Sequence, residues 1–343
     1  MHMADALISP AVGGLMWAAS AGSIAYSTAK IKNELGEKKI PVMAVAGAFV
    51  FAAQMINFTI PGTGSSGHIG GGILLAGLLG SFPALLTIAA VLVIQALFFA
   101  DGGLLALGCN IFNMGVVPCF IIYPLLFKPL IKKEFSVPRL TAASVLSVVV
   151  GLQLGAFAVV LETLASGITA LPFGVFALLM QPIHLAIGLV EGIVTGLVLN
   201  FVYKMRPEIV ESGVRGEPIA QGVSMKRVLA MLAVITVLVG GILSIFASAY
   251  PDGLEWAMEK TINASSPEGT AELEAEGPAF RQAEAIQEAT AFMPDYDFPN
   301  AGEDGSAAGT TVAGIVGAAL TCLLAGGVGF VIYQVKKHRI RTA

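Results

Sequence analysis

The chain has 343 residues, of which 56% are hydrophobic and 12% charged, and its formal net charge is −4 at pH 7. Soluble domains carry about 25% charged residues, so this composition excludes a soluble globular protein and indicates an all-α, polytopic helical membrane protein. The three cysteines, Cys109, Cys119 and Cys322, lie far apart in apolar segments, a spacing that indicates neither a disulfide framework nor a thiolate metal site.

The first two residues, Met1-His2, have the donor atoms of a metal chelate. A free terminal amine, the amide nitrogen of the second residue and Nδ1 of its imidazole close two fused rings around one ion. These nitrogens lie near one plane, and one more imidazole completes the square-planar set that Ni(II) and Cu(II) favour. No basic segment precedes the first apolar stretch, so we expect no removable signal peptide and Met1 as the mature N-terminus.

Two predicted helices, 10–29 and 40–60, lead to a glycine-rich loop that contains His68. Six glycines between residues 62 and 72 allow the backbone to fold inward and the histidine to approach closely. Irregular backbone at membrane depth is tolerated where it is buried in protein or lines a cavity. If His68 supplies the fourth nitrogen, the chain contains a nickel pocket in a membrane.

The apolar stretch 69–100 fits either one long helix or two short ones that meet at Pro83, since about 20 apolar residues cross the hydrocarbon core. The positive-inside rule places Lys39 and Lys128 on the same, cytoplasmic side, which requires an even number of crossings between them. A break at Pro83 gives four crossings and is therefore favoured. The nine predicted spans lie near residues 10–29, 40–60, 69–81, 83–100, 104–127, 139–165, 172–203, 227–249 and 311–334.

The basic residues also predict the orientation of the chain. Seventeen of the 19 lysines and arginines fall into four clusters, which the positive-inside rule places in the cytoplasm. The clusters run from Lys30 to Lys39, from Lys128 to Arg139, from Lys204 to Arg227 and from Lys336 to Arg341. We therefore predict a multi-pass protein of the cell membrane, in contact with lipid, with the N-terminus outside and the C-terminus in the cytoplasm.

Several polar residues lie within or next to the predicted spans, where buried polar groups are expensive. Metal-bound histidines commonly donate their second N–H to a carboxylate or carbonyl, so some of these residues are candidate partners of the ligands. The candidates are Asn57, Ser65, Asn110, Asn113 and Glu191. The pairs Asn110 and Asn113, and His184 and Glu191, each share one helix face. Ordinary hydrogen bonding between helices is the alternative for Asn110, Asn113 and His184.

A polar segment, residues 207–226, is the best domain boundary. We predict that it is a cytoplasmic linker between a seven-helix metal-binding unit, 1–206, and a two-helix hairpin unit, 227–343. Between the last two helices, the segment 250–310 holds 13 of the 23 acidic residues, and the parity of the spans places it outside. It either concentrates cations near an external opening or is a solvated spacer.

The chain resembles the substrate-binding component of energy-coupling-factor (ECF) transporters for nickel and cobalt, the NikM/CbiM family. The resemblance covers nearly the whole chain and is carried by Met1-His2, by Ser66-Gly67-His68-Ile69-Gly70 and by the segment 101–115. The C-terminal part is similar to the small NikN-type component, because Pro251-Asp252-Gly253-Leu254-Glu255 follows the eighth predicted span. Natural fusions of the two components are associated with nickel more than with cobalt.

The resemblance implies a seven-helix S-component that holds its ion with Met1 N, His2 N, His2 Nδ1 and an imidazole nitrogen of His68. It also implies that an alanine stripe on the second helix contacts a transmembrane coupling (T) subunit. The stripe consists of Ala44, Ala48 and Ala52. The sequence has no G-x-x-x-x-G-K-[ST] phosphate loop, so we expect no ATP hydrolysis by this chain; a pair of cytoplasmic ATPase subunits would supply it.

We therefore predict a Ni(II)-binding component of an ECF-type importer, with the metal as transported ion and with no resident cofactor, no enzymatic activity and no nucleic-acid partner. Co(II) is the alternative substrate, since it ranks below Ni(II) for nitrogen donors, whereas Cu(II) would bind these donors at least as tightly. A metal sensor or scaffold that does not transport the ion is an alternative from a second class of function. A membrane enzyme with His184 and Glu191 as an acid–base pair is an alternative from a third class, but no nucleophile or cofactor motif accompanies these two residues.

Overall fold

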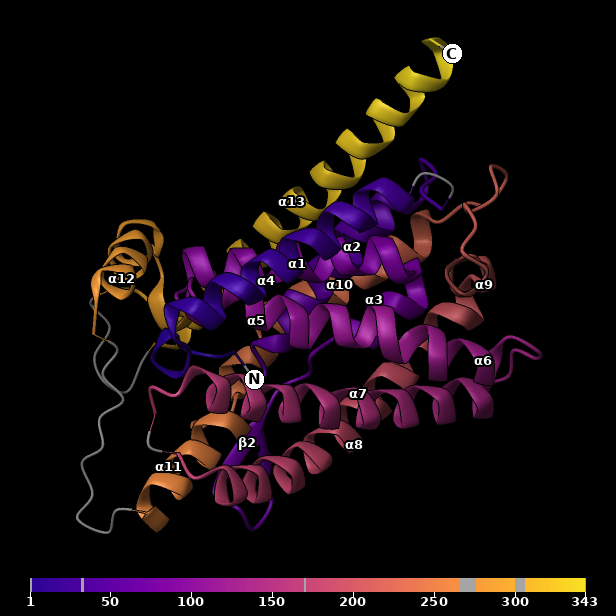
Figure 1. The fold of residues 1–343 in the computed structure, drawn as a ribbon. Helices are drawn as coiled ribbons and strands as arrows, with labels where there is room; N and C mark the ends of the chain where they lie inside the picture. The colour runs from indigo at the N-terminus through magenta and orange to yellow at the C-terminus, as the bar shows by residue number, and fades with distance from the viewer. Residues whose placement is uncertain (1, 32–33, 170, 266–275, 300–305, 343) are drawn as a thin grey trace.

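The computed structural model describes residues 2–31, 34–169, 171–265, 276–299 and 306–342, and these are predominantly helical (Figure 1). The α-helices are α1 (Pro10–Lys30), α2 (Lys39–Gln54), α3 (Gly72–Leu79), α4 (Ser81–Phe98), α5 (Leu107–Ile111), α6 (Lys128–Ile131), α7 (Val137–Ser166), α8 (Phe173–Met205), α9 (Pro207–Arg215), α10 (Lys226–Gly241), α11 (Gly253–Ser265), α12 (Pro278–Thr290) and α13 (Ala307–Thr342). A π-helix, η3 (Phe112–Phe127), joins α5 to α6, and short 3-10 turns are η1 (Asp5–Leu7), η4 (Leu243–Phe246) and η5 (Pro294–Tyr296). The predicted all-α fold class is confirmed.

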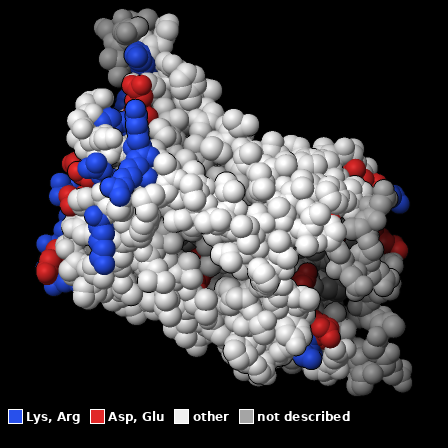
Figure 2. Space-filling view, turned by 180° about the vertical axis from the view of Figure 1, so that it is seen from behind, with Lys and Arg blue, Asp and Glu red and all other residues white. Residues whose placement is uncertain are grey.

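Five helical stretches among the described residues are long and apolar enough, by length and composition, to cross a membrane. They are Ser81–Phe98, Leu107–Ile131, Val137–Ser166, Phe173–Met205 and Ala307–His338. Figure 2 shows a broad uncharged band across one face of the molecule, with most of the lysines and arginines on this face gathered at one end. The chain is therefore a multi-pass membrane protein.

The predicted span 69–81 needs correction. The break before α4 is present, at Gly80 with φ +88°, but α3 has only eight residues, so it is about 12 Å long and too short to cross a bilayer by itself. Gly71, with φ +80°, precedes the helix. A left-handed backbone conformation at both ends, which glycine adopts readily, thus makes α3 a buried half-helix.

The predicted helix 40–60 also ends early, at Gln54. The chain then forms a β-hairpin of β1 (Phe58–Ile60) and β2 (Ser65–Gly67), antiparallel with Thr59 opposite Ser66. Gly62 and Gly64 have positive φ in the turn between the strands. This hairpin and the glycines that follow it carry His68 from the end of α2 back into the molecule.

The two C-terminal helices α10 and α13 pack on α2 and on each other. A Cβ added at Gly326 of α13 would lie 3.1 Å from Ala44 Cβ, and one added at Gly240 of α10 would lie 3.2 Å from Ala52 Cβ. The expectation that the alanine stripe contacts a coupling subunit is therefore wrong for these two positions. Small residues allow close helix contact in membranes, and here the contact is made within the chain.

The predicted linker 207–226 contains a packed helix. Ile209, Val210 and Val214 of α9 are buried, and a Cβ added at Gly213 would lie 2.8 Å from the carbonyl oxygen of Gly77 in α3. The described parts of the acidic segment are helical too, in α11 and α12. The spacer interpretation of 250–310 does not hold for these parts, because they contact the rest of the protein.

Candidate metal site

Two imidazoles from distant parts of the chain, His2 and His68, meet in a cavity of about 770 Å³. Their ring centroids are 5.1 Å apart and their planes differ by 13°. Their side chains are only 7% and 8% exposed. Burial lowers the pKa of each histidine to about 3, so both rings are neutral at physiological pH, which is the form that binds metal. Met1, the other predicted ligand, lies outside the described residues.

The main chain at Met3 fixes the position of His2. Met3 N donates to Asn110 Oδ1 at 2.8 Å, and Met3 O accepts from Asn110 Nδ2 at 3.3 Å and from Gly103 N at 2.9 Å. Two residues further on, Asp5 Oδ1 accepts from Ala106 N at 2.9 Å. The N-terminal tail is thus held in register on the segment 102–110, and residue 2 is the first position beyond this anchor.

The segment after β2 positions His68. Nδ1 of His68 lies 3.1 Å from Ile69 O, an arrangement in which Nδ1 carries the proton and Nε2 keeps its lone pair. Gln54 Nε2 donates to Gly70 O at 2.8 Å, and Gly71 N donates to Glu191 Oε1 at 2.9 Å. Side chains from α2 and α8 therefore hold the backbone that follows the histidine.

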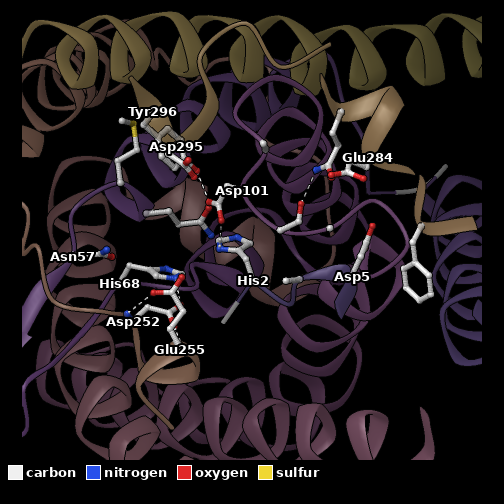
Figure 3. A pocket seen from close by; sticks show the side chains of 18 of the residues that line it. His2, Asp5, Asn57, His68, Asp101, Asp252, Glu255, Glu284, Asp295 and Tyr296 are labelled. Carbon is white, nitrogen blue, oxygen red and sulfur yellow. Dashed lines mark hydrogen bonds and ion pairs between the residues drawn. The ribbon is translucent and has the colours of Figure 1, made fainter. Parts of the chain in front are cut away.

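A carboxylate faces each imidazole (Figure 3). His2 Nδ1 lies 3.2 Å from Asp101 Oδ1, and His68 Nε2 lies 3.9 Å from Asp252 Oδ2. The Tyr296 hydroxyl donates to the other oxygen of Asp101. In this arrangement the His2 nitrogen of the predicted chelate is engaged with Asp101, so binding a metal through it requires this contact to give way.

The cavity is strongly acidic. The carboxylates that line it come from the N-terminal tail, from the segment before α5 and from the acidic segment, and they are Asp5, Asp101, Asp252, Glu255, Glu276, Glu284 and Asp295. A cleft lined by charges of one sign raises the local concentration of the opposite ion. The described parts of the segment 250–310 thus contribute carboxylates to this cavity, which supports the alternative that the segment concentrates cations.

The five candidate partners lie around the site, but they mainly contact backbone. Asn110 holds Met3 and Glu191 holds Gly71, as described above. Asn113 Nδ2 donates to Glu162 Oε2 at 2.8 Å, and Ser65 Oγ lies 3.2 Å from Ser66 O. Asn57 lines the cavity, and its carbonyl accepts from Ser248 N at 2.7 Å. Asn110 and Glu191 thus hold the segments that bear the histidines, whereas Asn113 joins η3 to α7.

Asp252 and Tyr296 are site residues that the sequence alone did not identify. One local signal was present for Asp252: Asp252 and Glu255 have the spacing of a capping box, and Glu255 N donates to Asp252 Oδ1 at 2.9 Å while Asp252 N donates to Glu255 Oε2 at 3.2 Å. That pattern predicts the start of α11. It carries no information about the contact with His68, which is 184 positions away.

Comparison with known proteins gives the family. The model for the cobalt uptake substrate-specific transmembrane region, CbiM, matches residues 2–209, and the PDGLE domain model matches residues 226–334. A putative fused nickel transport protein NikMN of Archaeoglobus fulgidus is 32% identical over 94% of this chain and 96% of its own. A putative metal transport protein of Haloquadratum walsbyi is 35% identical over 61% of this chain and 93% of its own.

A solved structure agrees with these sequence matches. The crystal structure of a transition metal transporter, 31% identical in sequence, superposes with a TM-score of 0.53 and covers 62% of this chain and 96% of that chain. The relatives are transport proteins, so this chain is a component of a transporter and not an enzyme. The first model matches more than half of the chain, and the protein therefore belongs to the CbiM family of substrate-specific transmembrane regions and carries a C-terminal PDGLE domain.

Proposed function

We propose that this chain is the substrate-binding component of an ECF-type importer and that it captures Ni(II) with Met1, His2 and His68. The observation that supports this most directly is the meeting of two buried, neutral imidazoles, 5.1 Å apart, in an acidic cavity. Met1 N, the amide nitrogen of His2, His2 Nδ1 and Nε2 of His68 form the four-nitrogen set. Such a set favours square-planar Ni(II).

The acidic cavity would attract the hydrated cation before it binds. The carboxylates Asp101 and Asp252 are the nearest to the two imidazoles. As the ion arrives, His2 Nδ1 would exchange its contact with Asp101 for the metal. The amine and amide nitrogens must lose protons for the chelate to form, so metal binding would release protons and weaken in acid.

Transport against a gradient requires partners. A transmembrane T subunit and a pair of cytoplasmic ATPase subunits would supply coupling and energy, as the family resemblance implies. The basic end of the molecule (Figure 2) would face these ATPases in the cytoplasm, by the positive-inside rule. The histidine site would then open toward the outside.

Co(II) is the second candidate substrate. The two carboxylates beside the imidazoles favour it, since oxygen ligands added to the four nitrogens would raise the coordination number above the square-planar four. The visible spectrum of the bound protein separates the two possibilities, because square-planar Ni(II) is distinct from five- or six-coordinate metal.

The proposal is tested on protein that is purified with an unmodified N-terminus and loaded with nickel. We expect about one nickel per chain and a weak d–d band of square-planar Ni(II). One added residue before Met1 moves the amine out of the chelate and should abolish tight binding. His68→Ala should do the same. His184→Ala is the control and should weaken binding less, because it removes another buried histidine whose Nδ1 lies 2.8 Å from a carbonyl of its own helix, that of Met180.

Two results would contradict the site. Undiminished affinity in the extended protein would exclude the N-terminal chelate, and undiminished affinity in His68→Ala would exclude His68. Uptake of nickel by cells that contain the T subunit and ATPases, and no uptake without them, would separate an importer from a sensor.

A further inference from the structure

One segment of the PDGLE domain lies along the hairpin that carries His68. We name residues 248–256 the latch and residues 58–68 the metal loop. Ser66 N donates to Pro251 O at 2.8 Å, and Ser66 Oγ donates to Tyr250 O at 2.7 Å. Ser248 N donates to Asn57 O at 2.7 Å, just before the loop. The latch thus runs alongside the metal loop and is hydrogen-bonded to it, as an additional strand at the edge of the hairpin would be.

A side chain of the latch, Trp256, also bonds to the metal loop. Its indole N–H donates to Thr63 O at 2.9 Å, at the turn of the hairpin. The ring also packs beside Ile60, Ile183 and Ile187. Trp256 therefore fastens the tip of the metal loop with one hydrogen bond and an apolar contact.

The latch is itself fixed to the body of the protein. Leu254 and Ala257 are buried in one cluster with Met3 and Leu7. A Cβ added at Gly253 would lie 2.8 Å from Ile187 Cδ1 of α8, so the backbone of the latch is pressed against that helix. The metal loop meets the same helix, since a Cβ added at Gly67 would lie 2.5 Å from Ile187 Cγ1. The latch and the metal loop therefore lie side by side against α8, and each restrains the other.

The same contacts place the latch next to the ligand. Asp252 accepts from Leu254 N and Glu255 N through Oδ1, and its Oδ2 lies 3.9 Å from His68 Nε2. An opening movement of the metal loop that carries His68 away from His2 would also separate the loop from the latch. This separation breaks the bonds from Ser66 and Trp256 at once.

We propose that the latch holds the metal loop closed and slows the release of the bound ion, with Trp256 as its positioning residue. The inference rests on the proposed function, because it concerns the rate at which the ion leaves the site containing His68. It assigns to the PDGLE domain a role in retaining the metal.

The test uses the full chain and two matched variants. Trp256→Phe keeps an aromatic ring and removes the indole donor. Trp17→Phe is the control for the loss of an indole donor, since Trp17 Nε1 makes an equivalent 2.9 Å bond to Leu104 O, on the segment that anchors the N-terminal tail and outside the metal loop. We measure nickel stoichiometry, the visible spectrum, and the rate of nickel loss to an excess of chelator. We expect Trp256→Phe to release nickel roughly threefold to tenfold faster, as the loss of one hydrogen bond predicts, with the stoichiometry and spectrum unchanged.

A second measurement needs no metal. Hydrogen exchange at the Ser66 amide, which donates to Pro251, should be faster in Trp256→Phe than in the wild type and in Trp17→Phe. Ser66→Ala removes the bond to Tyr250 O and should also accelerate nickel loss. This variant replaces Trp256→Phe in the test if Trp256→Phe does not fold.

The outcomes separate the latch from the site. Equal rates of nickel loss in the wild type, Trp256→Phe and Ser66→Ala would overturn the latch and leave the metal site intact. No nickel in the wild type would overturn the proposed function, and the Ser66 amide would then still report whether the latch restrains the loop.

Discussion

Asn110 fixes the position of the N-terminal tail. It is 1% exposed and forms hydrogen bonds with both backbone groups of Met3, which is fully buried. A chelate that uses a terminal amine and the next amide requires the N-terminal tail to lie at one position along its binding segment. If the tail moved by one residue, other atoms would take the place of the donor nitrogens. One side chain that binds both the N–H and the C=O of Met3 fixes that register. Asn110 therefore acts on the site through the backbone of Met3.

Asn110→Ala should weaken Ni(II) binding about tenfold or more while leaving the spectrum of the bound ion unchanged. The reason is that Met3 N becomes a buried donor without its acceptor, which costs about 1–3 kcal/mol. Asn110→Asp keeps the acceptor and should recover part of the affinity. Asn200→Ala is the control: its amide binds Thr141 and Gly196 within α7 and α8, so that variant should lose stability but not affinity. Equal affinities for Asn110→Ala and Asn200→Ala would contradict this role.

At the scale of the secondary-structure elements, glycines allow the C-terminal helices to pack closely on each other and on α2. A Cβ added at Gly314 of α13 would lie only 2.0 Å from the carbonyl oxygen of Gly240 in α10, and one added at Gly317 would lie 2.0 Å from the ring of Phe51 in α2. Backbone atoms cannot move aside as a flexible side chain can. The PDGLE domain thus docks on the CbiM region through helix backbones in near contact, which is the typical use of small residues between membrane helices.

Gly314→Ala should lower the free energy of unfolding of the detergent-solubilised protein by about 1–3 kcal/mol, because overpacking forces the two helices apart. Its melting temperature should fall accordingly. Gly327→Ala lies on the same helix and has no atom within 4 Å of the added Cβ. It should leave stability unchanged or raise it by about 0.5–1 kcal/mol, since alanine is the better helix former. A melting temperature for Gly314→Ala equal to that of Gly327→Ala would show that the helices are not in contact there.

The sequence predicts the helices better than their packing. Composition and apolar length give the fold class and most of the long helices, and the break before α4 follows from charge parity. A helix was predicted at 69–81, but the short length of α3 was not, because its apolar run continues beyond both ends and the helix stops at Gly71 and Gly80, which have positive φ. The position of α13 on α2, and the contact of Asp252 with His68, depend on tertiary packing between residues far apart in the chain. No pattern of neighbouring residues in the sequence predicts such contacts.

At the scale of the molecule, the acidic cavity and the basic end lie in different places. The cavity is lined by the N-terminal tail and the acidic segment, and the basic side chains gather at one end in Figure 2. Two lysines at the start of α2 connect segments of the chain: Lys38 Nζ donates to Val223 O at 2.7 Å, and Lys39 Nζ donates to Leu79 O at 3.1 Å at the end of α3. The half-helix α3 therefore runs from the glycines that follow His68 to the beginning of α2.

Cysteine labelling in cells tests the orientation that this polarity predicts. Lys133, after α6, and Glu288, on α12, are both exposed. In a background without the native cysteines, Glu288→Cys should react with a membrane-impermeant maleimide in intact cells, and Lys133→Cys should react only after permeabilisation, because basic loops stay in the cytoplasm. The parent without added cysteine controls for background labelling. The opposite pattern would place the acidic cavity on the cytoplasmic side, where it would serve release of the ion and not its capture from outside.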